Sequence, residues 1–200
     1  MDYNLEIYNG SQDLTEFFRG AAERGFYNNS SKEMLIDYIK KYEDSTLFLL
    51  YYKDKIIGTS VSHSLKELGI LGKDAYRIAA RTCILNNQIG GERAHAVHNY
   101  RHSPMNHWTS QILTPACMYY VGLDTPMYIS TNTNTVGSQN KVHRTWTKIM
   151  NNQGYLKDPI DLEYKGSFQT FWKVDVKFYL KKLEENIWPE TKEILDIFLT

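Results

Sequence analysis

The stretch of residues 127–155 combines a polar, turn-forming loop with a helix start, an arrangement that can bind a small anionic or carbonyl group. Residues 127–131 have strand composition, residues 132–137 are polar, and residues 138–152 have the spacing of an amphipathic helix that Gly154 can end. The unpaired N–H groups at a helix N-terminus point outward and can hold such a group. The alternative is an ordinary strand–helix unit of a mixed fold.

A second group of candidate residues is a cluster of histidines. Four of the six histidines, His95, His98, His102 and His107, fall within thirteen residues. Neutral imidazoles are good zinc ligands, but this spacing matches no familiar ligand motif. A metal site is therefore kept only as an alternative, and no metal ligands are assigned.

The two cysteines, Cys83 and Cys117, lie far apart and outside any CxxC pattern. This spacing predicts buried thiols rather than a disulfide framework. Cys83 could in principle be an acyl-enzyme nucleophile, but the sequence offers no activating base near it. We therefore expect Cys83 to be structural.

The composition excludes several classes of protein. The 200 residues suit one domain, and 42% hydrophobic residues are enough for a core. Lys+Arg and Asp+Glu are both 23, so no net charge draws the chain toward nucleic acid or a membrane surface. With no apolar run of membrane-spanning length and no signal-peptide pattern, we expect a cytoplasmic protein that binds neither.

The hydrophobic patterns predict strands and helices in alternation. Strands are expected at 5–8, 46–52, 56–62, 76–85, 127–131, 160–164 and 167–176. Gly58 suggests a bulge or a close approach, and residues 86–100 are expected to form a long loop. Helices are expected at 11–25, from Ser30, from Ser103 with an end or kink before Pro115, from Thr114 to Gly122, at 138–152, and over 178–199 with a break at Pro189.

In this order of elements the chain resembles the GNAT superfamily of N-acyltransferases over roughly residues 5–176. The best local matches are the hairpin LFLLYYKDKIIGTSVS and the helix end KIMNNQGY, which is similar to the family's aromatic-x-x-x-Gly-aromatic ending. The resemblance implies an α+β fold, with a mostly antiparallel mixed sheet flanked by helices. It also implies a splayed parallel pair of strands, here 76–85 and 127–131. We expect a GNAT-like acyltransferase domain at 1–176, with 177–200 as its C-terminal helical extension.

The resemblance further implies acetyl-CoA as co-substrate, bound in the wedge between the two splayed strands. Backbone groups left unpaired there can pair with the amides of the pantetheine arm. Cys83, Ile84 and Leu85 would contact the acyl and pantetheine groups from the first strand. Asn132 and Asn140, which follow the second strand, are further expected cofactor-binding residues.

Two segments are candidates for the pyrophosphate of the coenzyme. Residues 88–93, QIGGER, follow the first wedge strand but match only Gln and one Gly of the family's Arg/Gln-x-x-Gly-x-Gly/Ala loop. Arg101, His102 and Ser103 instead offer a cation beside the helix start at Pro104, which suits a phosphate. We prefer this second segment. Its alternative role is a simple helix cap beside a solvated Arg101.

The expected chemistry is acyl transfer, an acetyl group by resemblance, to an amine of a small molecule or peptide by direct attack on the thioester. The family often has a proton-donating Tyr at the position of Met150, which cannot donate a proton. His143, on the same predicted helix, can take that role because its ordinary pKa lies near neutrality. Because Met150 occupies the position of the proton donor, a catalytically inactive ligand-binding module is an alternative function. A His-rich metal protein is a weaker alternative. Glu67 and Asp74 could attract a cationic amine or be solvated surface carboxylates, and an oligomer is possible.

Overall fold

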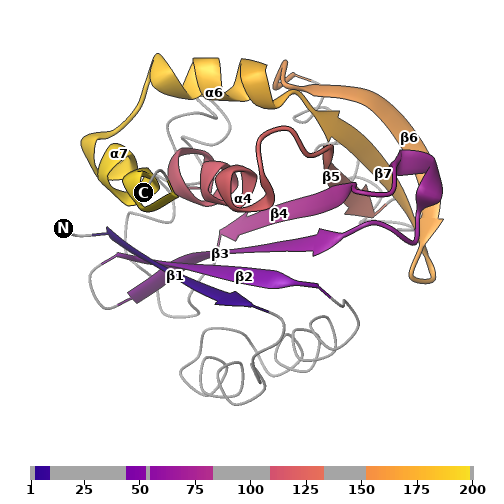
Figure 1. The fold of residues 1–200 in the computed structure, drawn as a ribbon, viewed down its shortest axis with the longest axis horizontal. Coiled ribbons are helices and arrows are strands. Elements are labelled where there is room, and N and C mark those ends of the chain that lie inside the picture. The colour runs from indigo at the N-terminus through magenta and orange to yellow at the C-terminus, as the bar shows by residue number, and fades with distance from the viewer. Residues whose placement is uncertain (1–2, 10–43, 53–54, 83–108, 133–151, 199–200) are drawn as a thin grey trace, which may run out of the picture.

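The described part of the chain forms one mixed β-sheet with helices packed on it. A computed structural model describes residues 3–9, 44–52, 55–82, 109–132 and 152–198 (Figure 1). Their seven strands have the order β1-β2-β3-β4-β5-β7-β6, and every adjacent pair is antiparallel except the parallel pair β4 and β5. The predicted α+β architecture is therefore confirmed. The strands are β1 (Tyr3–Asn9), β2 (Thr46–Tyr52), β3 (Lys55–Ser64), β4 (Tyr76–Thr82), β5 (Met127–Asn132), β6 (Leu156–Tyr164) and β7 (Ser167–Val174).

The described helices after β4 follow the expected order with changed boundaries, and the short helix η1 was not predicted. The described helices are η1 (Gly69–Leu71), η2 (Thr109–Leu113), α4 (Thr114–Val121), α6 (Val176–Glu184), α7 (Pro189–Leu195) and η3 (Asp196–Phe198). Gly122 ends α4, and Pro189 separates two helices, as predicted. The helices expected at 11–25, from Ser30 and at 138–152, and the helix start at Ser103, lie outside the described residues.

Three local features of the strands follow from backbone conformation. The turn between β6 and β7 has positive φ at both Lys165 (49°) and Gly166 (75°), which suits a tight two-residue hairpin. The register of β2 and β3 shifts beside Gly58, so the expected bulge is confirmed. β6 begins at Leu156, earlier than predicted, because a second register shift with Asp158 at φ 50° accommodates Pro159 within an edge strand.

Hydrophobic side chains are buried on both faces of the sheet. On the face covered by α4, α6 and α7, the main core includes Phe48, Ile78, Met127 and Trp172 (Figure 1). We call this the α4 face. On the opposite face, Phe171 lies in a second cluster of buried residues: Leu65, Leu71, Ala75, Tyr128, Tyr164 and Phe171. Neighbouring side chains of β7 alternate between the two faces, with Trp172 in the main core and Phe171 in the second cluster, and Phe168 near the turn is 50% exposed.

Buried hydrogen bonds connect the C-terminal helices to η2. Pro115 has no N–H to donate to a carbonyl one turn earlier, and the helix passes there from the π-helical turn η2 to α4. The Tyr179 hydroxyl donates to the Ser110 carbonyl at 2.5 Å. Fully buried Gln111 donates to the Asn186 carbonyl at 2.9 Å. Its side-chain oxygen accepts from the Trp188 backbone N–H and from the Thr191 hydroxyl.

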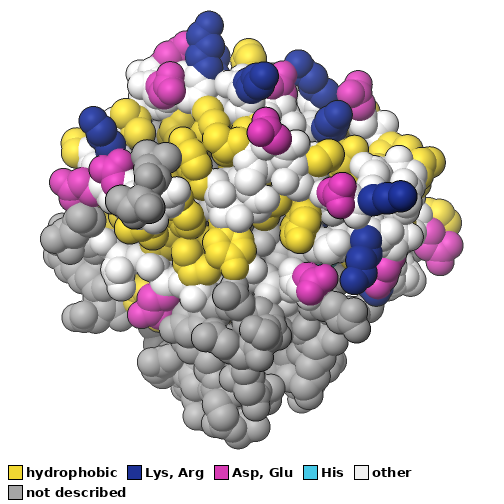
Figure 2. Space-filling model, viewed as in Figure 1, with side chains coloured by type: hydrophobic (Ala, Val, Ile, Leu, Met, Phe, Trp, Pro, Cys, Tyr) yellow, Lys and Arg dark blue, Asp and Glu magenta, His cyan; other side chains and the backbone are white. Residues whose placement is uncertain are grey.

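The surface charge is mixed. Figure 2 shows Lys and Arg side chains interspersed with Asp and Glu on the viewed face, in keeping with the zero net charge of the sequence. Within the described ranges, no helix is long and apolar enough to cross a membrane.

Candidate functional site

The parallel strands β4 and β5 separate shortly after they begin. Their only residue pairs within the described chain are Tyr76 with Met127 and Arg77 with Tyr128. β4 continues to Thr82 and β5 to Asn132 without pairing again. The splayed parallel pair expected from the resemblance is therefore confirmed. We call the opening between residues 78–82 and residues 129–132 the wedge.

The wedge presents backbone hydrogen-bonding groups that have no strand partner among the described residues. On its other edge, each residue of 78–82 is paired with β3, and each residue of 129–132 is paired with β7. In antiparallel pairing, alternate residues direct their N–H and C=O groups to the partner strand, and those between direct theirs away from it. The intervening groups of both strands therefore face the wedge, where an extended ligand with amide groups can pair with them.

Most predicted site residues lie outside the described part of the chain. This holds for His143, Cys83, Ile84, Leu85, Arg101, His102, Ser103 and Asn140, and for the other clustered histidines His95, His98 and His107. Asn132 is the last residue of β5, so its backbone lies at the open end of the wedge. Within the described ranges, no group of three or more His, Cys, Asp or Glu residues could hold a metal ion.

Polar side chains connect the two strands at the point where their backbone pairing stops. Arg77, which is 8% exposed, donates from Nε to the Ser130 hydroxyl at 2.6 Å. Ser130 lies two residues beyond Tyr128, the last paired residue of β5. The sequence analysis missed this contact. The available signal was the presence of two cations, Arg77 and Arg81, within the otherwise largely apolar strand pattern YRIAARTCIL. Nothing in the sequence distinguished Arg77 from Arg81 or pointed to Ser130.

His63 is fully buried beside Arg77 and titrates abnormally. It is the β3 partner of Arg77, and its ring stacks on Tyr164 with centroids 6.2 Å apart. Burial, with the charges of Arg77 and Lys165, lowers the pKa of His63 to about 3. His63 is therefore neutral at physiological pH, and its pKa is too low for a general base working near neutrality.

Three other residues considered in the sequence have surroundings that account for them without a functional role: Cys117, Glu67 and Asp74. Cys117, predicted to be a buried thiol, is fully buried, with its Sγ 2.9 Å from the Ser60 hydroxyl. Burial raises the pKa of Cys117 to about 12, so it is not a reactive thiolate. The Glu67 carboxylate contacts Lys165 Nζ through both oxygens, at 2.7 and 2.6 Å. Asp74 is exposed, as a solvated carboxylate would be.

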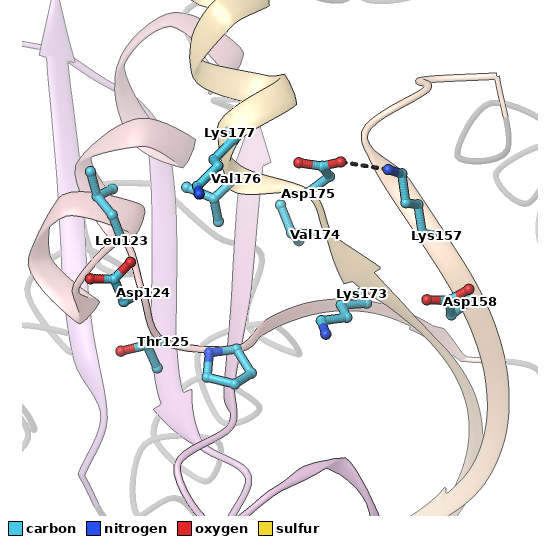
Figure 3. Close-up of a pocket in the computed structure, with 11 residues that line it drawn as sticks. Leu123, Asp124, Thr125, Lys157, Asp158, Lys173, Val174, Asp175, Val176 and Lys177 are labelled. Atoms are coloured by element: carbon cyan, nitrogen blue, oxygen red, sulfur yellow. Dashed lines mark hydrogen bonds and ion pairs between the residues drawn. The ribbon is translucent and has the colours of Figure 1, made fainter.

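A separate cavity of about 400 Å³ lies at the closed end of the wedge (Figure 3). Its lining residues come from the turn before β5, from β6, from the end of β7 and from the start of α6. Equal numbers of acidic and basic side chains line it, so it has no excess charge to attract a phosphate or a cation. These are Asp124, Asp158, Asp175, Lys157, Lys173 and Lys177.

The chain was compared with known proteins. No protein-family model and no curated protein matches it. Solved structures align with it at low identity. A Desulfovibrio desulfuricans protein assigned to the GNAT family of acetyltransferases has 9% identity, covers 86% of this chain and 99% of its own, and has a TM-score of 0.42.

Two other alignments have similar extent. The aminoglycoside N(6′)-acetyltransferase of Legionella pneumophila has 10% identity, covers 91% of this chain and 96% of its own, and has a TM-score of 0.46. The Campylobacter jejuni N-acetyltransferase PseH in complex with acetyl coenzyme A has 13% identity, covers 85% of this chain and 99% of its own, and has a TM-score of 0.42. At these values the alignments assign no substrate or activity. The fold is assigned from the strand order and the splayed pair.

The low pKa of His63 predicts acid sensitivity of the fold. Below pH 6.5 the unfolded chain protonates His63, whereas the folded chain does not until about pH 3. The free energy of unfolding should therefore fall as the pH is lowered, by roughly 1–2 kcal/mol between pH 7.5 and 5 for this group. Urea unfolding at both pH values should show a correspondingly smaller fall for His63→Gln than for the wild type. Equal falls would contradict the burial of a neutral His63.

Proposed function

We propose that the protein is an acyl-CoA-dependent N-acyltransferase that uses acetyl-CoA as co-substrate. The observation that supports this best is the wedge, whose two edges carry backbone groups that match the amides of a pantetheine arm. The arm would lie between β4 and β5 like an inserted strand, with hydrogen bonds to both. Such binding depends on backbone geometry and requires no particular side chains.

The nucleotide half of the coenzyme is proposed to bind beyond the wedge. The segment between β4 and α4 contains Arg101, His102 and Ser103. Together with α4 it connects the two wedge strands along the chain. A guanidinium and helix N–H groups favour phosphate oxygens. Cys83, Ile84 and Leu85 directly follow the described end of β4 and are proposed to contact the acyl and pantetheine groups. Asn132 and Asn140 are proposed contacts from the other side.

The proposed reaction is direct attack of an amine on the thioester. The amine nitrogen forms a bond to the acyl carbon and gives up one proton to water, the C–S bond breaks, and the coenzyme leaves as a thiolate that takes up a proton. His143 is proposed to supply that proton because Met150 cannot. The acceptor is proposed to be an amine of a small molecule or a peptide. The free thiol of Cys117 suits the reducing cytoplasm, the proposed location.

Calorimetry with acetyl-CoA, CoA and adenosine 3′,5′-bisphosphate tests coenzyme binding. We expect acetyl-CoA and CoA to bind more tightly than the bisphosphate, which lacks the pantetheine arm. Arg101→Ala should weaken acetyl-CoA binding by about 1.5–3 kcal/mol through loss of a charge-assisted hydrogen bond. Arg93→Ala, in the competing segment 88–93, is the matched control and should have little effect. Equal affinity for all three ligands would argue against the wedge, and a larger effect of Arg93→Ala would move the pyrophosphate to 88–93.

Thiol release with a panel of amines tests catalysis. His143→Gln should lower turnover by about 10²-fold or more, because a general acid acts in the transition state, with acetyl-CoA affinity nearly unchanged. Turnover remains because a thiolate is a tolerable leaving group, a free thiol having a pKa of about 8.5. Wild-type turnover in His143→Gln would remove this role. If the protein binds the coenzyme but releases no thiol from acetyl-CoA with any amine of the panel, the alternative of a catalytically inactive ligand-binding module is favoured.

A further inference from the structure

The side chain of Arg77 connects β4 and β5 where their backbone hydrogen bonds end. Arg77 belongs to the last residue pair of the parallel ladder, with Tyr128 as its partner. Its Nε reaches forward to the Ser130 hydroxyl at 2.6 Å. This side-chain hydrogen bond connects the strands one step beyond their last backbone pair, on the face of the sheet opposite α4.

The Ser130 hydroxyl is held in one orientation by its second hydrogen bond. It accepts from Arg77 and donates to Gln169 Oε1 at 2.8 Å. Gln169 in turn donates from Nε2 to the Ser167 hydroxyl at 3.0 Å, which donates to the Tyr164 carbonyl at 3.1 Å. Every donor in this series points away from Arg77. The series therefore runs in one direction from β4 across β5 to β7 and its hairpin turn.

The surroundings of Arg77 restrict its movement. Arg77 is 8% exposed, and the buried ring of its β3 partner His63 stacks on Tyr164. On the α4 face at the same level, Ile78 and Met127 are buried in the main core. Burying a guanidinium costs free energy unless its N–H groups are hydrogen-bonded, so loss of the Ser130 contact would leave the buried Nε–H without this acceptor. The angle at which the two strands separate is therefore tied to the Arg77–Ser130 contact.

We propose that Arg77 is a positioning residue, which acts with Ser130 and Gln169 to fix how far β4 and β5 diverge and so where an acyl thioester comes to rest in the wedge. This role rests on the proposed acyltransferase function. In this role Arg77 acts through the two strands that hold the ligand and not on the reacting atoms themselves. Small displacements of reacting groups lower turnover more than they lower binding, because most of the coenzyme lies away from the reacting carbon.

Steady-state thiol release by wild type, Arg77→Met, Arg77→Lys, Ser130→Ala and Lys173→Met tests this role. Arg77→Met should lower kcat about 10- to 100-fold, with KM for acetyl-CoA changed less than about threefold. Ser130→Ala should lower kcat in the same direction, and the Arg77→Met/Ser130→Ala double variant should lose less than the product of the two effects. Arg77→Lys should restore part of kcat. Lys173→Met, at an exposed cation on β7 outside the hydrogen-bonded series, should retain wild-type kcat.

Three results would overturn the proposal, and they are distinguishable. A wild-type protein that releases no thiol overturns the proposed function and, with it, this role. An active wild type with unchanged kcat in folded Arg77→Met and Ser130→Ala overturns the positioning role alone. If Arg77→Met does not fold, the kcat values of Ser130→Ala and Arg77→Lys test the positioning role instead. A wild-type kcat in both of these variants would overturn it. Multiplicative effects in the double variant would also contradict it, because they would show that Arg77 and Ser130 act separately.

Discussion

The parallel pairing of β4 and β5 ends after two residue pairs, and the proposed function depends on that constraint. In a continuous sheet the backbone groups of residues 78–82 and 129–132 would satisfy one another. Here each strand is held on its outer edge by an antiparallel neighbour, while no strand in the described part of the chain pairs with its inner edge there. Unpaired backbone groups are costly when they are away from water. A ligand that supplies amide groups along the opening would recover those hydrogen bonds.

The two faces of the sheet support the divergence in different ways. On the α4 face, apolar residues of the strands and helices form one continuous core, and buried hydrogen bonds of Gln111 and Tyr179 hold the C-terminal helices against η2. On the opposite face the connection is polar and directional, from Arg77 through Ser130 to Gln169. Apolar packing tolerates small shifts, whereas a hydrogen bond loses strength quickly with distance and angle. The hydrogen bonds from Arg77 through Ser130 to Gln169 are therefore better suited than the apolar packing to set the separation of the two strands.

The sequence predicted the parts of this structure that depend on periodicity and turn chemistry. Gly58 marked the bulge in β3, Gly122 the end of α4 and Pro189 the break between the last two helices. The start of β6 at Leu156 was not predicted, because it depends on a register shift at Asp158 and Pro159 of an edge strand, which periodicity does not show. The Arg77–Ser130 contact joins residues 53 positions apart on adjacent strands, and no local pattern encodes such a pairing. The proposed catalytic residue His143 and the proposed phosphate-binding residues Arg101, His102 and Ser103 lie outside the described residues.

Backbone amide hydrogen exchange, measured with and without saturating acetyl-CoA, tests the role of the wedge most directly. Insertion of the pantetheine arm predicts slower exchange in residues 78–82 and 129–132, where the arm would accept hydrogen bonds from inner-edge N–H groups. Exchange around the cavity formed by Asp124, Lys173 and Lys177 should stay unchanged, because that cavity lies at the closed end of the strands. Slower exchange confined to that cavity, or unchanged exchange in both wedge segments, would contradict binding between β4 and β5.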